Sequence, residues 1–182
     1  MSKLIIFPTD TVYGIGCSIW DLKNIEKIYE LKHRSYDKPL ACLCASLEQI
    51  EQIAYVDLRA QALIKQFLPG ALTLILKSKP EVKKLLGYET IGVRIPNCKE
   101  ALAILKENGP MLTTSVNESG QEAMNSYEEI KKKYNDVVDL ILPPTIKSSS
   151  IASTVLLLVN DEIKLLREGS ITSSMINDVI HV

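Results

Sequence analysis

Long apolar runs and an excess of charge of one sign are both missing from this sequence of 182 residues. The apolar segments Leu4–Phe7 and Val155–Val159 are far shorter than the ~20 residues that cross a bilayer. Lys and Arg number 21 against 22 Asp and Glu, so the formal net charge is −1. We therefore expect a soluble, cytoplasmic protein with no membrane role, in which any site for a polyanion is a local feature.

Histidines and the common catalytic motifs are scarce as well. The histidines are His33 and the penultimate His181, which leaves one credible base for a Ser-His-Asp triad. The sequence has no Gly-x-x-x-x-Gly-Lys phosphate loop, no Gly-x-Gly-x-x-Gly, no Gly-x-Ser-x-Gly and no His-Glu-x-x-His. These absences argue against covalent hydrolase chemistry.

The four cysteines are too few for a disulfide framework. Each lies in or beside an apolar segment, so we expect free thiols. Cys42 and Cys44 would share one face of a strand, but no nearby His or Cys-x-x-Cys pair completes a set of metal ligands. Packing in the core is therefore the favoured interpretation, and no metal site made of protein residues is predicted.

Alternating strand and helix patterns run through the whole sequence. The expected strands are Ser2–Phe7, Leu40–Cys44, Leu72–Lys77, Ile91–Ile95, Met111–Thr114, Ile151–Val159 and Ile163–Leu166. The expected helices are Leu22–Leu31, Ser46–Ile53, Asp57–Phe67, Lys99–Glu107, Ser126–Tyr134 and Ser173–Ile180, whereas Thr9–Gly16 and the lysine-rich segment Lys77–Lys84 are expected to be loops. Because the strands cluster at 72–95 and 151–166, we predict one α/β domain over residues 1–182, with a twisted, mixed parallel and antiparallel sheet flanked by helices.

Polar residues stand where several apolar strands begin or end. They are Thr9-Asp10-Thr11, Ser115-Val116-Asn117 and Ser153-Thr154. Ligand sites in open α/β sheets form at strand ends, where loops converge on one crevice. Each group taken singly is better explained as a cap or an Asx turn, but together they predict a polar crevice.

Cations form a second set of candidates. Lys32, Arg34 and Lys38 either bind a polyphosphate or complement the dipole at a helix end, and composition does not separate the two. Arg94 and Arg167 lie at the ends of apolar strands, where a buried guanidinium needs an anion or solvent. Structural salt bridges would satisfy them singly, but with Arg34 they suggest a carboxylate or phosphate cleft.

Seven segments of the sequence resemble, in order, those of the YrdC-like threonylcarbamoyl-AMP synthases, in the short, single-domain form. They are Pro8–Gly16, Lys32–Leu40, Pro69–Leu76, Gly92–Pro96, Thr114–Gly120, Ser153–Val155 and Leu166–Thr172. The resemblance covers nearly the whole chain. It implies an open, positively lined cavity and the formation of threonylcarbamoyl-AMP and pyrophosphate from L-threonine, bicarbonate and ATP, with Mg²⁺ accompanying the ATP phosphates. The product serves N6-threonylcarbamoyladenosine (t6A) modification at position 37 of tRNA, through a separate tRNA threonylcarbamoyl transferase complex.

The resemblance also implies roles for particular residues. Those expected to bind threonine are Thr11, Arg94, Thr113 and Ser153. Those expected to bind ATP are Lys32, Arg34, Lys38, Thr90, Ser115, Asn117 and Arg167, among which Lys32, Arg34, Ser115 and Asn117 are the expected catalytic residues.

Departures from the family pattern keep two alternatives open. The family commonly has a His where this chain has Leu43, so threonine is the least certain of the implied substrates. Asp10 replaces a frequent Glu, and Val116 replaces a small residue. The alternatives are adenylation of a different small acid, and an RNA-binding protein without this chemistry, against which the near-neutral charge and the scarcity of aromatic residues weigh.

Overall fold

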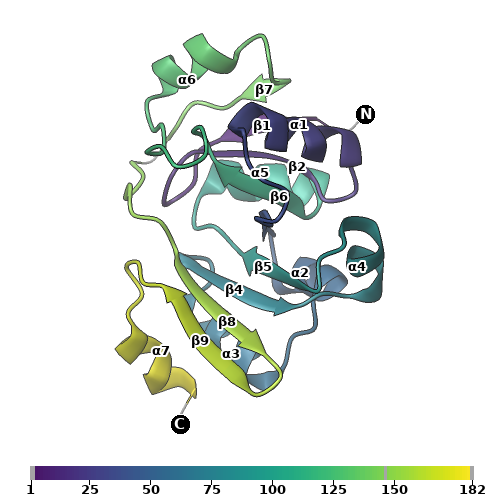
Figure 1. Ribbon diagram of the computed structural model, residues 1–182. Helices are drawn as coiled ribbons and strands as arrows, with labels where there is room; N and C mark the ends of the chain where they lie inside the picture. The colour runs from purple at the N-terminus through teal and green to yellow at the C-terminus, as the bar shows by residue number, and fades with distance from the viewer. Residues whose placement is uncertain (1–2, 146, 181–182) are drawn as a thin grey trace.

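The structure, a computed structural model, describes residues 3–145 and 147–180, so Ser2 and His181 lie outside the described residues. The strands form one sheet in the order β7-β1-β2-β6-β3-β5-β4-β8-β9 (Figure 1). The strands are β1 (Ile5–Phe7), β2 (Gly14–Ser18), β3 (Ala41–Leu43), β4 (Leu72–Lys77), β5 (Thr90–Arg94), β6 (Met111–Ser115), β7 (Leu140–Ile141), β8 (Thr154–Val159) and β9 (Glu162–Arg167). The helices are α1 (Leu22–Lys32), α2 (Leu47–Ile53), α3 (Leu58–Phe67), α4 (Pro80–Leu86), α5 (Lys99–Asn108), α6 (Tyr127–Tyr134) and α7 (Ser173–Ile180).

The sheet is mixed, as the clustering of strands predicts. Strand pairs β1/β7, β3/β5 and β4/β8 are parallel. Pairs β1/β2, β2/β6, β3/β6, β4/β5 and β8/β9 are antiparallel. Antiparallel neighbours can follow one another through a short turn, as β8 and β9 do around Asn160, whose φ is 54°.

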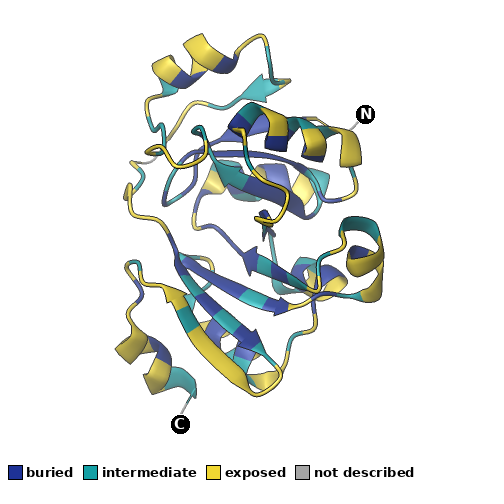
Figure 2. Cartoon of the chain, in the orientation of Figure 1, coloured by how far each residue is buried: buried dark blue, intermediate teal, exposed yellow. Residues whose placement is uncertain are grey.

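The two faces of the sheet are covered unequally. Along β4 and β5, Leu72, Leu74 and Leu76, with Ile91 and Val93, enter a large apolar cluster that also takes residues from α1–α4, α6 and α7. The alternate residues of β1, β3 and β6 enter a smaller cluster with α5. Because successive side chains of a strand point to opposite faces, α5 lies on the face opposite the other helices and covers only part of it. Figure 2 shows the central strands largely buried and the edge strand β9 largely exposed.

In three of the predicted helices the first predicted residue is the N-cap. Ser46, Asp57 and Ser126 each accept a hydrogen bond from the backbone N–H three residues on. The four cysteines are free and buried, as expected. No helix within the described ranges has the length and apolar character needed to span a membrane.

Two loop predictions are wrong. Residues Gly14–Ser18 form strand β2, although Gly14 and Gly16 suggested a loop. A Cβ at Gly16 would lie 2.6 Å from Oγ1 of Thr113 on β6, so glycine is present because the neighbouring strand comes close. The lysine-rich segment does not form a loop, because helix α4 begins within it. Pro80 lies in the first turn of this helix, and the helix ends before Gly87, whose φ is 71°.

Candidate ligand-binding site

A cavity of about 450 Å³ lies against the face of the sheet that α5 leaves uncovered. Its floor consists of residues whose neighbours along the strand belong to the large apolar cluster: Thr73 and Ile75 on β4, Thr90 and Gly92 on β5, Thr113 and Ser115 on β6, and Val155 on β8. This volume falls within the ~300–1,000 Å³ of ordinary ligand pockets. Strand alternation therefore produces one core face and one ligand-facing side.

Small side chains keep this floor open. Gly14, Ala41 and Gly92 line it on β2, β3 and β5. A Cβ at Gly92 would lie 3.3 Å from Cγ2 of Thr73 and 3.7 Å from Cβ of Ala41, so a larger side chain at this position would crowd Thr73. A ligand can approach the backbone here because no larger side chain covers it.

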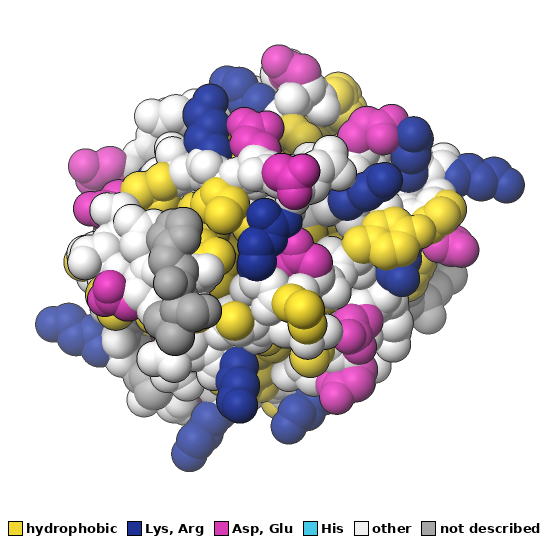
Figure 3. Space-filling view, turned by 90° about the horizontal axis from the view of Figure 1, so that it is seen from below, with side chains coloured by type: hydrophobic (Ala, Val, Ile, Leu, Met, Phe, Trp, Pro, Cys, Tyr) yellow, Lys and Arg dark blue, Asp and Glu magenta, His cyan; other side chains and the backbone are white. Residues whose placement is uncertain are grey.

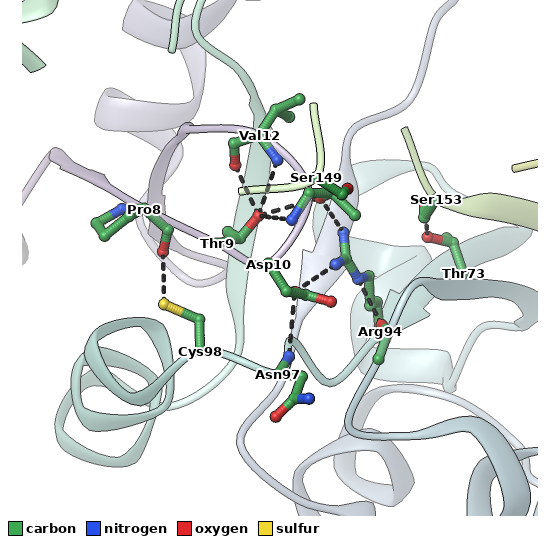
Figure 4. A network of polar contacts seen from close by, with 12 residues as sticks. Pro8, Thr9, Asp10, Val12, Thr73, Arg94, Asn97, Cys98, Ser149 and Ser153 are labelled. Atoms are coloured by element: carbon green, nitrogen blue, oxygen red, sulfur yellow. Dashed lines mark hydrogen bonds and ion pairs between the residues drawn. The ribbon is translucent and has the colours of Figure 1, made fainter. Parts of the chain in front are cut away.

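Arg94 lies in the wall of the cavity and its guanidinium is fully engaged on one side (Figure 4). Its Nη2 donates to Oδ1 of Asp10 at 2.6 Å, its Nη1 to Oγ1 of Thr11 at 2.7 Å, and its Nε to the carbonyl of Gly70 at 2.8 Å. Burial lowers the pKa of Arg94, and the carboxylate of Asp10 opposes that shift. The anion that a guanidinium at this strand end requires is thus Asp10.

Arg34 reaches the cavity from the loop that follows α1. The helix ends at Lys32, and the φ of 49° at the next residue, His33, turns the chain out of the helix. Arg34 donates from Nε to the carbonyl of Lys38 at 2.9 Å and from Nη2 to the carbonyl of Pro39 at 3.1 Å. The hydroxyl of Tyr29 also donates to the carbonyl of Lys38, at 3.1 Å. The loop is therefore fixed to the helix that carries it, and the guanidinium has donors left for a ligand.

Arg167 enters from the end of β9 and is held by Ser153. Its Nε donates to the Ser153 carbonyl at 2.9 Å and its Nη2 to the Ser153 hydroxyl at 3.3 Å. The Ser153 hydroxyl also shares a hydrogen bond of 2.8 Å with that of Thr73. Burial lowers the pKa of Arg167. Among the described residues, the ion pairs involve neither Arg34 nor Arg167.

Lys32 is buried beneath the loop that follows β6. Its Nζ donates to the carbonyls of Ser115 and Asn117, at 2.6 and 2.8 Å, and to Oδ1 of Asn117, at 2.6 Å. Burial, and then the nearby charge of Arg34, lower the pKa of Lys32 to about 8. All three protons of the ammonium are engaged by this loop, so Lys32 fixes its position.

Most of the residues predicted for the site line this one cavity, although they come from distant parts of the sequence. These are Thr11, Arg34, Thr90, Arg94, Thr113, Ser115, Ser153 and Arg167. Within the described part of the chain, Lys32, Lys38 and Asn117 are not among the lining residues. Lys32 and Asn117 support Ser115 from behind, and Lys38 contributes its carbonyl to the Arg34 loop.

Thr73 and Thr114 carry hydroxyls in the lining that were not predicted. Of the group Thr9-Asp10-Thr11 expected in a polar crevice, Thr9 and Thr11 line the cavity, whereas Asp10 is not among the lining residues and holds Arg94. Thr73 is a single hydroxyl residue among Leu and Ile in Leu72–Lys77. Alternation places it on the face opposite the leucines, and this position could have identified it as a lining residue of the cavity. Leu43 and Ala41 share that side and line the cavity as well.

Fold and site together define a class, that of α/β proteins with an open, mixed sheet and an arginine-lined ligand cavity on its less covered face. The chain belongs to the Sua5/YciO/YrdC family, whose sequence profile, described as "Telomere recombination", matches residues 1–169. The family resemblance of the sequence is thereby confirmed.

Individual relatives agree with this assignment. The threonylcarbamoyl-AMP synthase of Bacillus subtilis is 35% identical over 184 residues, which cover 98% of this chain and 53% of that protein. The crystal structure of Pyrococcus abyssi Sua5 complexed with L-threonine superposes with a TM-score of 0.89 at 33% identity, covering 98% of this chain and 54% of that one. The crystal structure of Escherichia coli YciO gives a TM-score of 0.82 at 33% identity, covering 93% of this chain and 84% of that one. The chain thus spans about half the length of two of these relatives and most of the third.

Proposed function

We propose that this chain is an L-threonylcarbamoyladenylate synthase, which forms threonylcarbamoyl-AMP and pyrophosphate from L-threonine, bicarbonate and ATP for t6A modification of tRNA, and that residues 1–182 act as one domain. The observation that carries the proposal is the convergence of Arg34, Arg94 and Arg167, from three distant segments, on one cavity. The names of the Bacillus subtilis and Pyrococcus abyssi relatives, and the threonine in the latter, support the choice of reaction.

In this reaction the protein has to position the substrates and neutralise the charge of the phosphates, and it needs no nucleophilic residue. Bicarbonate loses hydroxide to give CO2, which the threonine amine takes up as a carbamate, and the proton lost by the amine combines with the hydroxide to form water. A carbamate oxygen then attacks the α-phosphate of ATP. The bond from the α-phosphorus to the bridging oxygen breaks, and pyrophosphate leaves. Arg34 and Arg167, which have no carboxylate partner among the described residues, are suited to the phosphates.

Threonine is assigned to Thr11, Arg94, Thr113 and Ser153, all of which line the cavity. Thr11 and Arg94 are already joined to each other, Thr113 lies on β6, and Ser153 directly precedes β8. Lys38 and Thr90 remain proposed contacts of ATP, Lys38 from outside the lining. Binding both substrates in one cavity lowers the activation barrier, because the entropic cost of bringing them together in the reactive orientation is met on binding.

Magnesium is proposed to enter with ATP. No cluster of three or more His, Cys, Asp or Glu side chains suited to a metal occurs within the described ranges, and the carboxylate of Asp10, between the lining residues Thr9 and Thr11, is bound to Arg94. Mg²⁺ keeps several waters and commonly binds through substrate phosphates, which fits a cavity without a cage of protein ligands. The ion is therefore part of the nucleotide substrate.

Leu43 favours a second candidate function, the adenylation of another small acid. Its side chain lines the cavity and is paired in register with Arg94, where the family commonly has a His. An apolar side chain at this place offers no hydrogen bond to the threonine hydroxyl. The RNA-binding alternative has weaker support, since Lys and Arg are interspersed with Asp and Glu on the face shown in Figure 3.

The deciding experiment is pyrophosphate release by the purified chain with MgATP. Release that requires both L-threonine and bicarbonate supports the synthase. Release that instead requires another amino acid or small acid, in a screen of each at equal concentration, supports the second candidate. No acid-dependent release, together with RNA affinity that falls steeply with salt, would favour RNA binding.

A further inference from the structure

The loop that presents Arg34 has no regular structure of its own. Residues 35–39, which link α1 to β3, are exposed and belong to neither a helix nor a strand. Arg34 donates from Nε and Nη2 to the carbonyls of Lys38 and Pro39, so the donors on Nη1 and the second donor on Nη2 remain for a ligand. The direction of these donors therefore depends on how the two carbonyls are held.

Two tyrosine hydroxyls connect this loop to the rest of the fold. Oη of Tyr29, on α1, donates to the carbonyl of Lys38 at 3.1 Å and lies 2.6 Å from Oη of Tyr88, in the segment between α4 and β5. The backbone N–H of Leu40 donates to Oη of Tyr88 at 3.4 Å. The hydrogen bonds thus begin at Leu40, pass through both hydroxyls and return to Lys38.

The donor of each of these hydrogen bonds follows from the groups involved. A carbonyl has no proton to give, so the single proton of Tyr29 goes to Lys38. The bond between the two hydroxyls must then use the proton of Tyr88, whose oxygen accepts from Leu40. Burial raises the pKa of Tyr29, so this hydroxyl keeps its proton. Hydrogen bonds linked in this way polarise and strengthen one another.

The two tyrosines are part of the core and not of the cavity. Tyr29 belongs to the large apolar cluster, and Tyr88 packs against that cluster. Within the described part of the chain, neither is among the lining residues of the cavity. The ring of Tyr36, from the exposed loop, stacks on that of Tyr29 with the ring centroids 4.6 Å apart. Residues of the core thus set the position of the Lys38 carbonyl.

We infer that Tyr29 and Tyr88 are positioning residues, whose paired hydroxyls hold the Lys38 carbonyl so that Arg34 faces the phosphates before the nucleotide binds. This inference rests on the proposed function, which assigns Arg34 to the phosphates. Tyr88 also lies two residues before Thr90, a lining residue at the start of β5, so the pair fixes the Arg34 loop relative to that strand. A loop already held in its bound arrangement loses less conformational entropy when the ligand binds.

Calorimetric titration of the purified chain with inorganic tripolyphosphate and with L-threonine tests the inference. Tyr29→Phe removes the hydroxyl and keeps the ring, and it is expected to raise the Kd for tripolyphosphate by roughly 2–10-fold, the usual contribution of one hydrogen bond. The Kd for L-threonine, whose proposed contacts lie outside this loop, should stay within about twofold of the wild-type value. Tyr134→Phe is the matched control, because it changes a tyrosine of the same apolar cluster on α6 and should leave both affinities unchanged.

Double-mutant cycles separate positioning from a general loosening of the fold. If Tyr29 acts through Arg34, Tyr29→Phe has no further effect on the Kd for ATP in the Arg34→Ala background. If the two tyrosines act in series, the variant with both Tyr29→Phe and Tyr88→Phe binds tripolyphosphate no more weakly than Tyr29→Phe alone. Thermal unfolding establishes that each variant is folded during titration. Tyr88 is only partly buried, so Tyr88→Phe, which is expected to weaken tripolyphosphate in the same direction, carries the test where Tyr29→Phe does not fold.

Three results would overturn the inference: unchanged tripolyphosphate affinity in both tyrosine variants, equal weakening of tripolyphosphate and L-threonine, or an undiminished effect of Tyr29→Phe in the Arg34→Ala background. A wild-type chain that binds neither tripolyphosphate nor ATP would overturn it as well. Acid-dependent pyrophosphate release together with unchanged affinities in the variants rejects the inference alone. The expected changes of affinity in a chain without such release reject the proposed reaction alone.

Discussion

Asp10 and Arg94 form an ion pair in the wall of the cavity, with Oδ1 and Nη2 2.6 Å apart and only 17% and 7% of their side chains exposed. Figure 4 shows that Oδ1 of Asp10 also receives the backbone N–H of Asn97. The loop after β1 is therefore tied to the end of β5 through a charge that needs neutralising. The same contact orients the guanidinium toward the cavity.

Asp10→Ala is expected to destabilise the fold by about 3–5 kcal/mol, because it leaves Arg94 buried without its anion. Urea denaturation measures this difference. Glu118→Ala is the matched control, since its pair with Lys133 is 3.2 Å long and more than 40% exposed on both sides, and such pairs contribute about 0–1 kcal/mol. An equal decrease in the free energy of unfolding in the two variants would show that the buried pair stabilises the fold no more than the exposed one.

Lys32 is expected to make stability depend on pH in the alkaline range. The pKa of Lys32 is about 8 in the folded chain, whereas the ordinary pKa of a lysine, expected in the unfolded chain, is 10.5. Between these two pH values the unfolded chain therefore binds more protons than the folded chain. Stability should therefore rise with pH through this window, by up to about 3 kcal/mol. The measurement is the difference in unfolding free energy between wild type and Lys32→Met at pH 7, 8, 9 and 10. A difference that stays constant would mean that the three hydrogen bonds keep Lys32 protonated.

Arg34→Ala is expected to lower threonine-dependent pyrophosphate release by about 100-fold or more, in line with the loss of a preorganised donor at developing charge. Its melting temperature should hardly change, because within the described ranges the hydrogen bonds of Arg34 go to carbonyls of its own loop. Arg59→Ala is the control, as Arg59 pairs with Asp57 and is not among the lining residues. Pyrophosphate release at the wild-type rate in Arg34→Ala would contradict the assignment of Arg34 to the phosphates.

Gly92→Val is expected to close the floor of the cavity. The new Cβ would lie 3.3 Å from Thr73 and occupy space that the ligand needs. We expect ATP affinity to fall more than tenfold at a stability cost of about 1–3 kcal/mol, typical of overpacking. Leu157→Val, on the same sheet face but outside the lining, should leave the affinity unchanged. Titration with ATP and thermal unfolding compare the two variants. Undiminished ATP binding by Gly92→Val would contradict the proposed location of ATP in this cavity.

The strands and helices followed mainly from local signals. Ser46 and Ser126 predicted helix starts because a side-chain oxygen at that position satisfies a free backbone N–H, and the structure shows that Asp57 caps α3 in the same way. The error at β2 has an equally local origin, because Gly14 and Gly16 suggest a turn until the neighbouring Thr113 is known.

Along β5 the sequence pattern alone was sufficient to separate the two faces, since alternation assigns Thr90, Gly92 and Arg94 to one side and Ile91 and Val93 to the core. How the side chains of different segments combine could be known only from the folded chain. The pairing of Arg94 with Asp10, and the burial of Lys32 under Ser115 and Asn117, join residues more than 80 positions apart. Such contacts depend on strand order and register, which no local pattern of the sequence specifies.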